Sequence, residues 1–151
     1  MKKFLVTLFL SSLFCNIAQA QSSLPECGGS PYEIKKFSLT GGGLATKAKM
    51  LAKWRNCHGT LINKDGSKYI GEFQGGKFSG QGTYAYSNGA VYEGGFKKGK
   101  SEGYGTYKFT NGDLYVGEFK ADSFHGQGTF TNRLGGKYEG EFAQGVYNGQ
   151  G

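Results

Sequence analysis

Tyr69-Ile70-Gly71-Glu72-Phe73 opens the stretch of sequence that decides the fold, because its pattern returns three more times. The copies are Tyr92-Glu93-Gly94-Gly95-Phe96, Tyr115-Val116-Gly117-Glu118-Phe119 and Tyr138-Glu139-Gly140-Glu141-Phe142. Each copy begins 23 residues after the one before it. A fixed period of this length is the sequence signature of a repeat architecture, and the fold has to be built from the repeated unit.

A second motif keeps the same phase. It reads Gly80-Gln81-Gly82-Thr83, then Gly103-Tyr104-Gly105-Thr106 and Gly126-Gln127-Gly128-Thr129, and it starts again at Gly149. Run backwards, the period places Cys57-His58-Gly59-Thr60 on the same motif. We therefore divide the repeat array, residues 57–151, into a half unit (57–68), three units (69–91, 92–114 and 115–137) and a partial unit (138–151).

Each unit is predicted to form two short strands. Successive side chains of a strand point to opposite faces, so Tyr69, Gly71 and Phe73 share one face while Ile70 and Glu72 share the other. One face is therefore aromatic and glycine, where rings lie over bare backbone. The positions expected to build this face are Tyr69, Gly71, Phe73, Gly80, Gly82, Tyr92, Gly94, Phe96, Gly103, Gly105, Tyr115, Gly117, Phe119, Gly126, Gly128, Tyr138, Gly140 and Phe142.

Tight turns are expected between units. Asp65-Gly66, Asn88-Gly89 and Asn111-Gly112 lie between one unit's second strand and the next unit's first strand, and such pairs favour hairpin turns. Arg133-Leu134-Gly135-Gly136 keeps the glycine in register but lacks the Asn, so a looser turn is expected there.

The motif Y-x-G-E-F-x-x-G-x-x-x-G-x-G-T at this period resembles the MORN repeat, from Cys57 to Gly151. The resemblance implies an all-β fold, an elongated and curved single-layer antiparallel sheet made of successive hairpins. With two strands per unit, each repeat would add roughly 10 Å of length. Such a ribbon offers a surface and leaves no room for a catalytic domain, including a lipid kinase domain of the kind that MORN repeats accompany.

The first twenty residues have the features of a secretory signal peptide. Lys2 and Lys3 precede an apolar run from Phe4 to Phe14, and Ala18-Gln19-Ala20 supplies a cleavage site before Gln21. The alternatives are a retained membrane anchor, for which the run is short, and a lipidated Cys15. Cleavage predicts an exported chain, periplasmic or secreted.

Residues 21–56 lack the repeat and are interpreted as an N-terminal cap of the array. Pro25, Pro31 and a run of three glycines favour irregular chain, and a short helix is expected at about residues 44–54, ending at Trp54. The alternative is that basic residues of this segment form a binding face. Those residues are Lys47, Lys49, Lys53 and Arg55.

Cys27 and Cys57 are expected to form a disulfide, because export places the chain in an oxidising compartment and a metal site would need closer spacing and more ligands. Two unpaired buried thiols are the alternative. At the other end, either the array continues beyond Gly151 or Tyr138 to Phe142 forms an exposed edge strand.

One stretch matches the phosphate-loop pattern G-x-x-x-x-G-K-[ST], namely Gly94-Gly95-Phe96-Lys97-Lys98-Gly99-Lys100-Ser101. That site needs a helix after the loop, whereas Glu102-Gly103-Tyr104-Gly105 follows, so no nucleotide is expected. His58 and His125 have no nucleophile or carboxylate placed to form a catalytic pair. Glu72, Glu118 and Glu141 repeat as a ladder of solvent-facing carboxylates. No enzyme activity, cofactor or metal is therefore predicted.

Binding remains, and two surfaces are candidates. Recurring rings could stack on sugars or hold a peptide, although they also suit the one-sided core; they are Tyr84, Tyr86, Tyr107, Phe109 and Phe130. Lysines that cluster in one inter-strand loop, with another one repeat earlier, could bind anions, although they also suit a solvated loop; they are Lys77, Lys97, Lys98 and Lys100. The first hypothesis is a non-catalytic scaffold or interaction module of the cell envelope that contacts protein or envelope components. The alternatives are a module that binds anionic lipid and an enzyme-associated accessory module that its repeats would cause to be mislabelled as a phosphoinositide kinase. Nucleic acid is not expected as a partner, because the formal charge of +7 falls to +5 once the signal lysines are removed.

Overall fold

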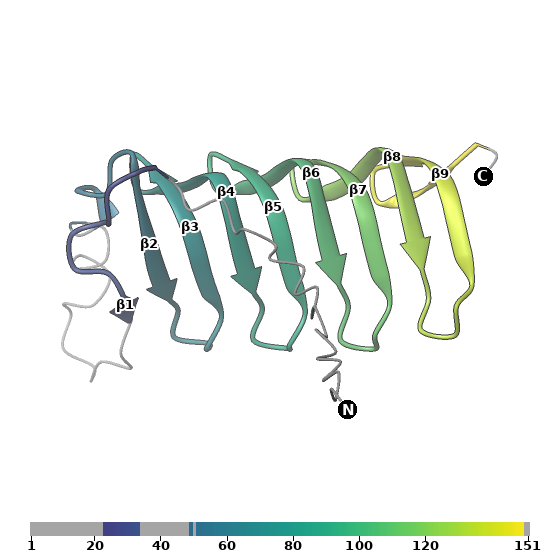
Figure 1. The fold of residues 1–151 in the computed structure, drawn as a ribbon, viewed down its shortest axis with the longest axis horizontal. Coiled ribbons are helices and arrows are strands. Elements are labelled where there is room, and N and C mark those ends of the chain that lie inside the picture. Colours follow the sequence, from purple (N-terminus) through teal and green to yellow (C-terminus); the bar gives the residue numbers. More distant parts are fainter. Residues whose placement is uncertain (1–22, 34–48, 50, 150–151) are drawn as a thin grey trace, which may run out of the picture.

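The computed structural model describes residues 23–33, 49 and 51–149. The expected signal peptide lies outside the described residues, and so does most of the expected helix at about 44–54, of which Lys49 and Leu51 have helical backbone. The described chain forms one open sheet in which the strands follow one another in sequence order, laid side by side along the long axis of the molecule (Figure 1).

Ten strands build this sheet. They are β1 (Tyr32–Glu33), β2 (Cys57–Ile62), β3 (Lys68–Gln74), β4 (Lys77–Ala85), β5 (Val91–Lys97), β6 (Lys100–Lys108), β7 (Leu114–Lys120), β8 (Ser123–Thr131), β9 (Lys137–Ala143) and β10 (Val146–Asn148). The short β1 runs parallel to β2, and every later neighbour is antiparallel. The predicted all-β sheet of successive hairpins is confirmed.

A row of glycines crosses the sheet at right angles to the strands. Each of these glycines lies directly opposite the next across a strand pair, and the row is Gly59, Gly71, Gly82, Gly94, Gly105, Gly117, Gly128 and Gly140. Two neighbouring glycines leave a strip of backbone that no side chain covers, which gives an aromatic ring room to lie flat on the sheet.

Tyrosine rings occupy that strip. A Cβ atom built on Gly82 would lie 2.6 Å from Cε2 of the Tyr69 ring, so the ring rests directly on the glycine. The Tyr69 hydroxyl donates a hydrogen bond to the carbonyl oxygen of Glu72 at 2.9 Å. Tyr92 and Tyr115 repeat both contacts in their own units, with hydroxyl to carbonyl distances of 2.8 and 2.9 Å. The ring therefore links the two strands of the hairpin near their midpoint, since it packs on a glycine of the second strand and bonds a carbonyl of the first.

The core is a continuous row of aromatic rings along one side of the sheet. Its buried members are Cys27, Trp54, Cys57, Leu61, Tyr69, Phe73, Tyr92, Phe96, Tyr115, Phe119 and Phe142. Most contacts are edge to face, as between Tyr92 and Phe119 with centroids 4.7 Å apart. Phe78 stacks on Tyr69 and Phe124 stacks on Tyr115, each at 3.9 Å. Rings thus supply the burial that aliphatic side chains supply in ordinary cores.

The loops between units share one conformation. In each, the glycine N–H donates back to the carbonyl three residues earlier, as from Gly89 to Tyr86 at 2.9 Å. The glycine has a positive φ, 92° at Gly89 and 88° at Gly135. The looser turn expected around Leu134 is wrong, because Asn132 Oδ1 accepts hydrogen bonds from the N–H groups of both Leu134 and Gly136 at 2.9 Å. In the loop at Gly89, the side chain of Asn88 accepts the equivalent hydrogen bond from the Ala90 N–H. Asn132 takes over this role in the loop at Gly135.

The loops inside units are two-residue turns with positive φ at both positions. They are Gly75-Gly76, Lys98-Gly99, Ala121-Asp122 and Gln144-Gly145. This is the tight hairpin geometry that matches strand twist. The last of these turns leads into β10, whose residues 146–148 pair with residues 141–143 of β9. The edge strand expected as one alternative at Tyr138 to Phe142 is therefore covered at Glu141 and Phe142, whereas residues 138–140 have no strand partner on that side within the described part of the chain.

Candidate interaction surfaces

The two faces of the sheet differ in chemistry. We call the side that carries the glycine row and the tyrosine rings the aromatic face, and the opposite side the polar face. Side chains alternate between the two faces along each strand, and paired residues of neighbouring strands share a face. All the lysines and glutamates of β2 to β10 therefore lie on the polar face, for example Glu93 opposite Thr106. The strand residues of the aromatic face carry no formal charge in the described part of the chain.

Part of the aromatic face is exposed as a line of rings, which we call the aromatic stripe: Tyr84, Tyr86, Tyr107, Phe109 and Phe130. Successive ring centroids in this order lie 4.7, 5.8, 4.7 and 5.8 Å apart. Tyr86 is 40% exposed, and the other four are partly buried. The stripe runs across β4, β6 and β8 at the ends that meet the loops between units.

The tyrosines stay protonated over a wide pH range. Burial, followed by the neighbouring Tyr107 and Asp122 side chains, raises the pKa of Tyr86 to about 12. Burial likewise raises the pKa of Tyr115 to about 12 and raises the pKa values of Tyr69, Tyr92 and Tyr107. Removal of a phenol proton would leave a charge among apolar rings, so the hydroxyls remain hydrogen-bond donors.

Unit 92–114 differs from its neighbours. Ser101 occupies the position where the units before and after it have the stacked rings Phe78 and Phe124. The carboxylate of Asp122, in the next unit's turn, accepts hydrogen bonds from the Ser101 N–H at 2.7 Å and from its hydroxyl at 3.2 Å. Asp122 has a φ of 74° at a turn position where the other units have glycine. A polar pair thus joins two adjacent units in place of a ring.

The lysines proposed to bind anions lie together at one margin of the sheet. Lys77, Lys97, Lys98 and Lys100 are all exposed and flank the two-residue turns, with the three strand lysines on the polar face. Lys120 lies at the same margin, one period after Lys97. The sequence interpretation missed it, although the 23-residue period was the signal that could have found it.

The phosphate-loop match lies on a hairpin. Its residues run from β5 through the Lys98-Gly99 turn into β6, so Ser101 is followed by a strand, and the Ser101 hydroxyl is bonded to Asp122. The geometry of a phosphate loop, in which backbone N–H groups converge at a helix terminus, is not formed at this stretch.

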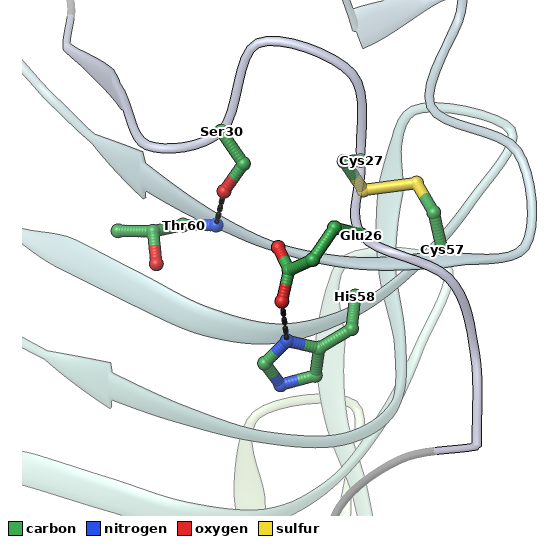
Figure 2. A network of polar contacts seen from close by, with 6 residues as sticks. All are labelled: Glu26, Cys27, Ser30, Cys57, His58 and Thr60. Carbon is green, nitrogen blue, oxygen red and sulfur yellow. Dashed lines mark hydrogen bonds and ion pairs between the residues drawn. A yellow bond between two sulfur atoms is a disulfide. The ribbon is translucent and has the colours of Figure 1, made fainter.

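The cap segment 25–33 lies along the outer edge of β2 (Figure 2). Cys27 and Cys57 form a disulfide with Cα atoms 5.0 Å apart. The Cys27 N–H donates to the His58 carbonyl at 2.7 Å, and the His58 N–H donates to the Pro25 carbonyl at 2.8 Å. The Ser30 hydroxyl oxygen accepts the Thr60 N–H at 2.8 Å. These bonds cover backbone groups that an edge strand would otherwise expose.

Trp54 closes the same end of the array. Its side chain is buried, its ring packs edge to face on Phe73 with centroids 4.6 Å apart, and its Nε1–H donates to the Gly28 carbonyl at 2.9 Å. Phe73, a ring of the first full unit, is therefore covered by a residue from outside the repeat.

The histidines and glutamates are not brought together as a catalytic group. His58 Nδ1 lies 3.6 Å from a carboxylate oxygen of the exposed Glu26 in the cap, while His125 is on β8 opposite Glu118. Glu118 accepts the Gln127 N–H at 3.2 Å, on the polar face. Among the described residues, no three His, Cys, Asp or Glu side chains could hold a metal ion together, and no helix is long and apolar enough to cross a bilayer.

Comparison with known families identifies the repeat. The family model of the MORN repeat matches residues 69–91, 92–114, 115–133 and 138–151, which together make up more than half of the chain. The third match stops at Arg133, within the loop and immediately before Leu134, which replaces the usual Asn. No match was found among the curated proteins that were searched.

Proposed function

Because this chain belongs to the MORN repeat family, we propose that it is a non-catalytic interaction module of the cell envelope that binds protein or envelope components through the surface of its ribbon. MORN repeats mediate interactions with proteins and membrane lipids, and the chain consists largely of them. The observation that carries the proposal is that all four matched units join one continuous sheet with two chemically distinct faces. Such a sheet offers extended surface along its whole length.

The cellular location in this proposal depends on the N-terminal sequence. A basic start, an apolar run and Ala18-Gln19-Ala20 support cleavage before Gln21, and the Cys27 to Cys57 disulfide suits an oxidising compartment. Fractionation of cells that express the full chain, followed by mass spectrometry, tests this part. We expect a protein that begins at Gln21 outside the cytoplasm. A protein that begins at Met1 in the cytoplasm would refute export.

The interaction itself is tested by a pull-down from envelope extract with the cleaved, disulfide-bonded chain. We expect the same envelope component to be retained in independent preparations. A matched variant with Tyr86→Ala and a second with Lys97→Ser, Lys98→Ser and Lys100→Ser would assign the interaction to the aromatic or the polar face. If nothing is retained beyond what a bare resin retains, the proposal fails.

Anionic lipid is a second candidate, favoured by the exposed lysine margin formed by Lys77, Lys97, Lys98, Lys100 and Lys120. Each lysine near an acidic bilayer contributes about 1 kcal/mol, and salt screens that attraction. Sedimentation with phosphatidylglycerol vesicles and with neutral phosphatidylcholine vesicles distinguishes this candidate. Binding to the acidic vesicles alone, weakened by salt and by the triple serine variant, would support it. Equal recovery with both vesicles would contradict it.

A further inference from the structure

The aromatic stripe combines regular spacing with strand residues that carry no charge, and the carboxylate of the turn residue Asp122 lies close enough to add to the rise that burial causes in the pKa of Tyr86. Tyr84, Tyr107 and Phe130 hold the same register in successive units, and Tyr86 and Phe109 are also related by the period. Consecutive units are two strand spacings apart, about 10 Å. The charged strand residues all lie on the other face. A ligand of this stripe should therefore be uncharged and should itself repeat along its length.

The rings are held in place and can still be reached. Contacts of 4.7 to 5.8 Å with their neighbours fix their orientation, while Tyr86 remains 40% exposed. The hydroxyls of Tyr86 and Tyr107 make no hydrogen bond to any other described residue, so both are free to donate to a ligand. A rigid, partly exposed ring with a polar tip loses little entropy when it binds.

Sugar polymers have the matching chemistry. The axial C–H groups of a pyranose ring form an apolar face that packs on an aromatic ring, and its hydroxyls meet phenol hydroxyls. In an extended β-1,4-linked chain every second sugar presents the same face to the same side, so the chemistry repeats once per disaccharide. Two of the three units of the stripe also offer a second ring, Tyr86 beside Tyr84 and Phe109 beside Tyr107, and an acetamido methyl group could pack there.

We infer that the aromatic stripe binds an uncharged, extended β-1,4-linked glycan of N-acetylglucosamine that lies across the strands with one disaccharide per repeat unit. This inference rests on the proposed interaction function and names the chemical class of its partner. From Tyr84 to Phe130 the stripe crosses four strand spacings, about 19 Å, which is roughly the length of two disaccharides.

Two other occupants fit less well. An acidic bilayer would need cations beside the rings, whereas the strand lysines lie on the polar face. A second copy of the chain would need no particular spacing along the stripe. The regular step and the lack of cations among the described strand residues of the aromatic face together favour the polymer.

Calorimetric titration of the cleaved, disulfide-bonded chain with N-acetylglucosamine oligomers tests the inference. We expect affinity to rise from the disaccharide to the tetrasaccharide, to change little at the hexasaccharide, and to be insensitive to salt because the oligomers are uncharged. We expect cellohexaose, which lacks the acetamido group, to bind more weakly. No heat of binding with the hexasaccharide would overturn the inference, and so would cellohexaose that binds equally well or more tightly.

Two tyrosines on opposite faces of the sheet provide a matched pair of variants. Tyr86→Ala removes a ring of the stripe and should raise the dissociation constant of the hexasaccharide roughly tenfold. Tyr104→Ala removes a ring that is 65% exposed on the polar face and should leave that dissociation constant unchanged. Tyr86→Leu retains apolar volume without a flat ring, and it should also weaken binding while its urea midpoint stays that of the parent chain. Equal losses from Tyr86→Ala and Tyr104→Ala would overturn the inference.

The outcomes separate this inference from the proposed function. Envelope components retained in the pull-down without any binding of the oligomers would overturn the glycan and leave the interaction module standing. A dimer in sedimentation that Tyr86→Ala dissociates, again without oligomer binding, would show that the stripe is an interface between copies. Oligomer binding that Tyr86→Ala weakens supports both.

Discussion

Tyr69, Tyr92 and Tyr115 show how one residue type holds each unit together. Each ring lies on a pair of facing glycines and each hydroxyl bonds the carbonyl three residues further along the chain. Glycine is required at these facing positions because both the tyrosine ring and the opposite strand approach the backbone closely. Any side chain there would push the ring and the strand away. Tyrosine is required because the hydroxyl reaches a carbonyl that phenylalanine would leave without this bond.

The substitution Gly82→Ala tests this close approach. The added Cβ would lie 2.5 Å from the Tyr69 hydroxyl oxygen and 2.6 Å from the ring, so the ring must move off the sheet. We expect the free energy of unfolding, measured by urea denaturation, to fall by about 2 kcal/mol. Gly28→Ala is the control, because a Cβ there meets no atom within 4 Å, and it should change stability by less than about 0.5 kcal/mol.

Ala121 tests the backbone of the two-residue turns. Its φ of 50° lies in the left-handed region, which costs a residue with a Cβ about 1 kcal/mol, and Ala121→Gly removes that cost at the expense of some chain entropy. We expect a gain of about 0.5 kcal/mol in the free energy of unfolding. The same change at Ala85, within β4, should lower it by about 0.5 kcal/mol. Equal signs at the two sites would contradict the turn geometry.

The hairpins are alike in outline but differ in how they join their neighbours. In the turns at Gly76, Gly99 and Gly145 the second turn residue donates its N–H to a carbonyl of the preceding unit or of the cap, as from Gly99 to Phe78 at 2.9 Å. Asp122 donates the same bond to Ser101 at 3.2 Å and adds its carboxylate. The exchange of a ring for serine and the exchange of glycine for aspartate therefore belong to one junction.

A double-mutant cycle on this junction measures that dependence. Ser101→Phe alone should lower the free energy of unfolding, because the new ring meets the Asp122 carboxylate. Ser101→Phe combined with Asp122→Gly restores the arrangement of Phe78 and Gly99 and should recover the loss. We expect a coupling energy of about 1 kcal/mol from urea denaturation of the four proteins. Strict additivity would show that the two residues act independently.

The tyrosines taken together set the alkaline limit of the whole sheet. In the unfolded chain a tyrosine ionises near pH 10, whereas burial raises the pKa of Tyr115 in the fold to about 12. Below about pH 10 both states keep the proton and stability is complete; above it the unfolded chain loses protons that the fold retains. We expect the thermal midpoint to be level below about pH 10 and to fall between about pH 10 and 12 as phenolate absorbance appears. A midpoint that is constant across that range would contradict burial of the rings.

Much of this architecture could be read from the period. The alternation around Tyr69, Gly71 and Phe73 gave the strands, their facing sides and the repeat family, because local spacing alone determines these features. The loop at Asn132 was misjudged because its stabilising side chain comes from two residues before the position examined. The bond between Ser101 and Asp122 joins residues 21 apart that differ from the pattern, and a consensus motif hides such exceptions. The identity of a partner depends on exposure and face, which only the assembled sheet reveals.

The bond between Ser101 and Asp122 also limits how an array of this kind can change its length by gene duplication or loss. Most junctions repeat the same contacts, so a recombination event that inserts or removes one unit would rejoin equivalent partners. At this junction a single-unit event would leave either an aspartate facing a phenylalanine or a serine without its acceptor. We expect units 92–114 and 115–137 to be inherited as one block.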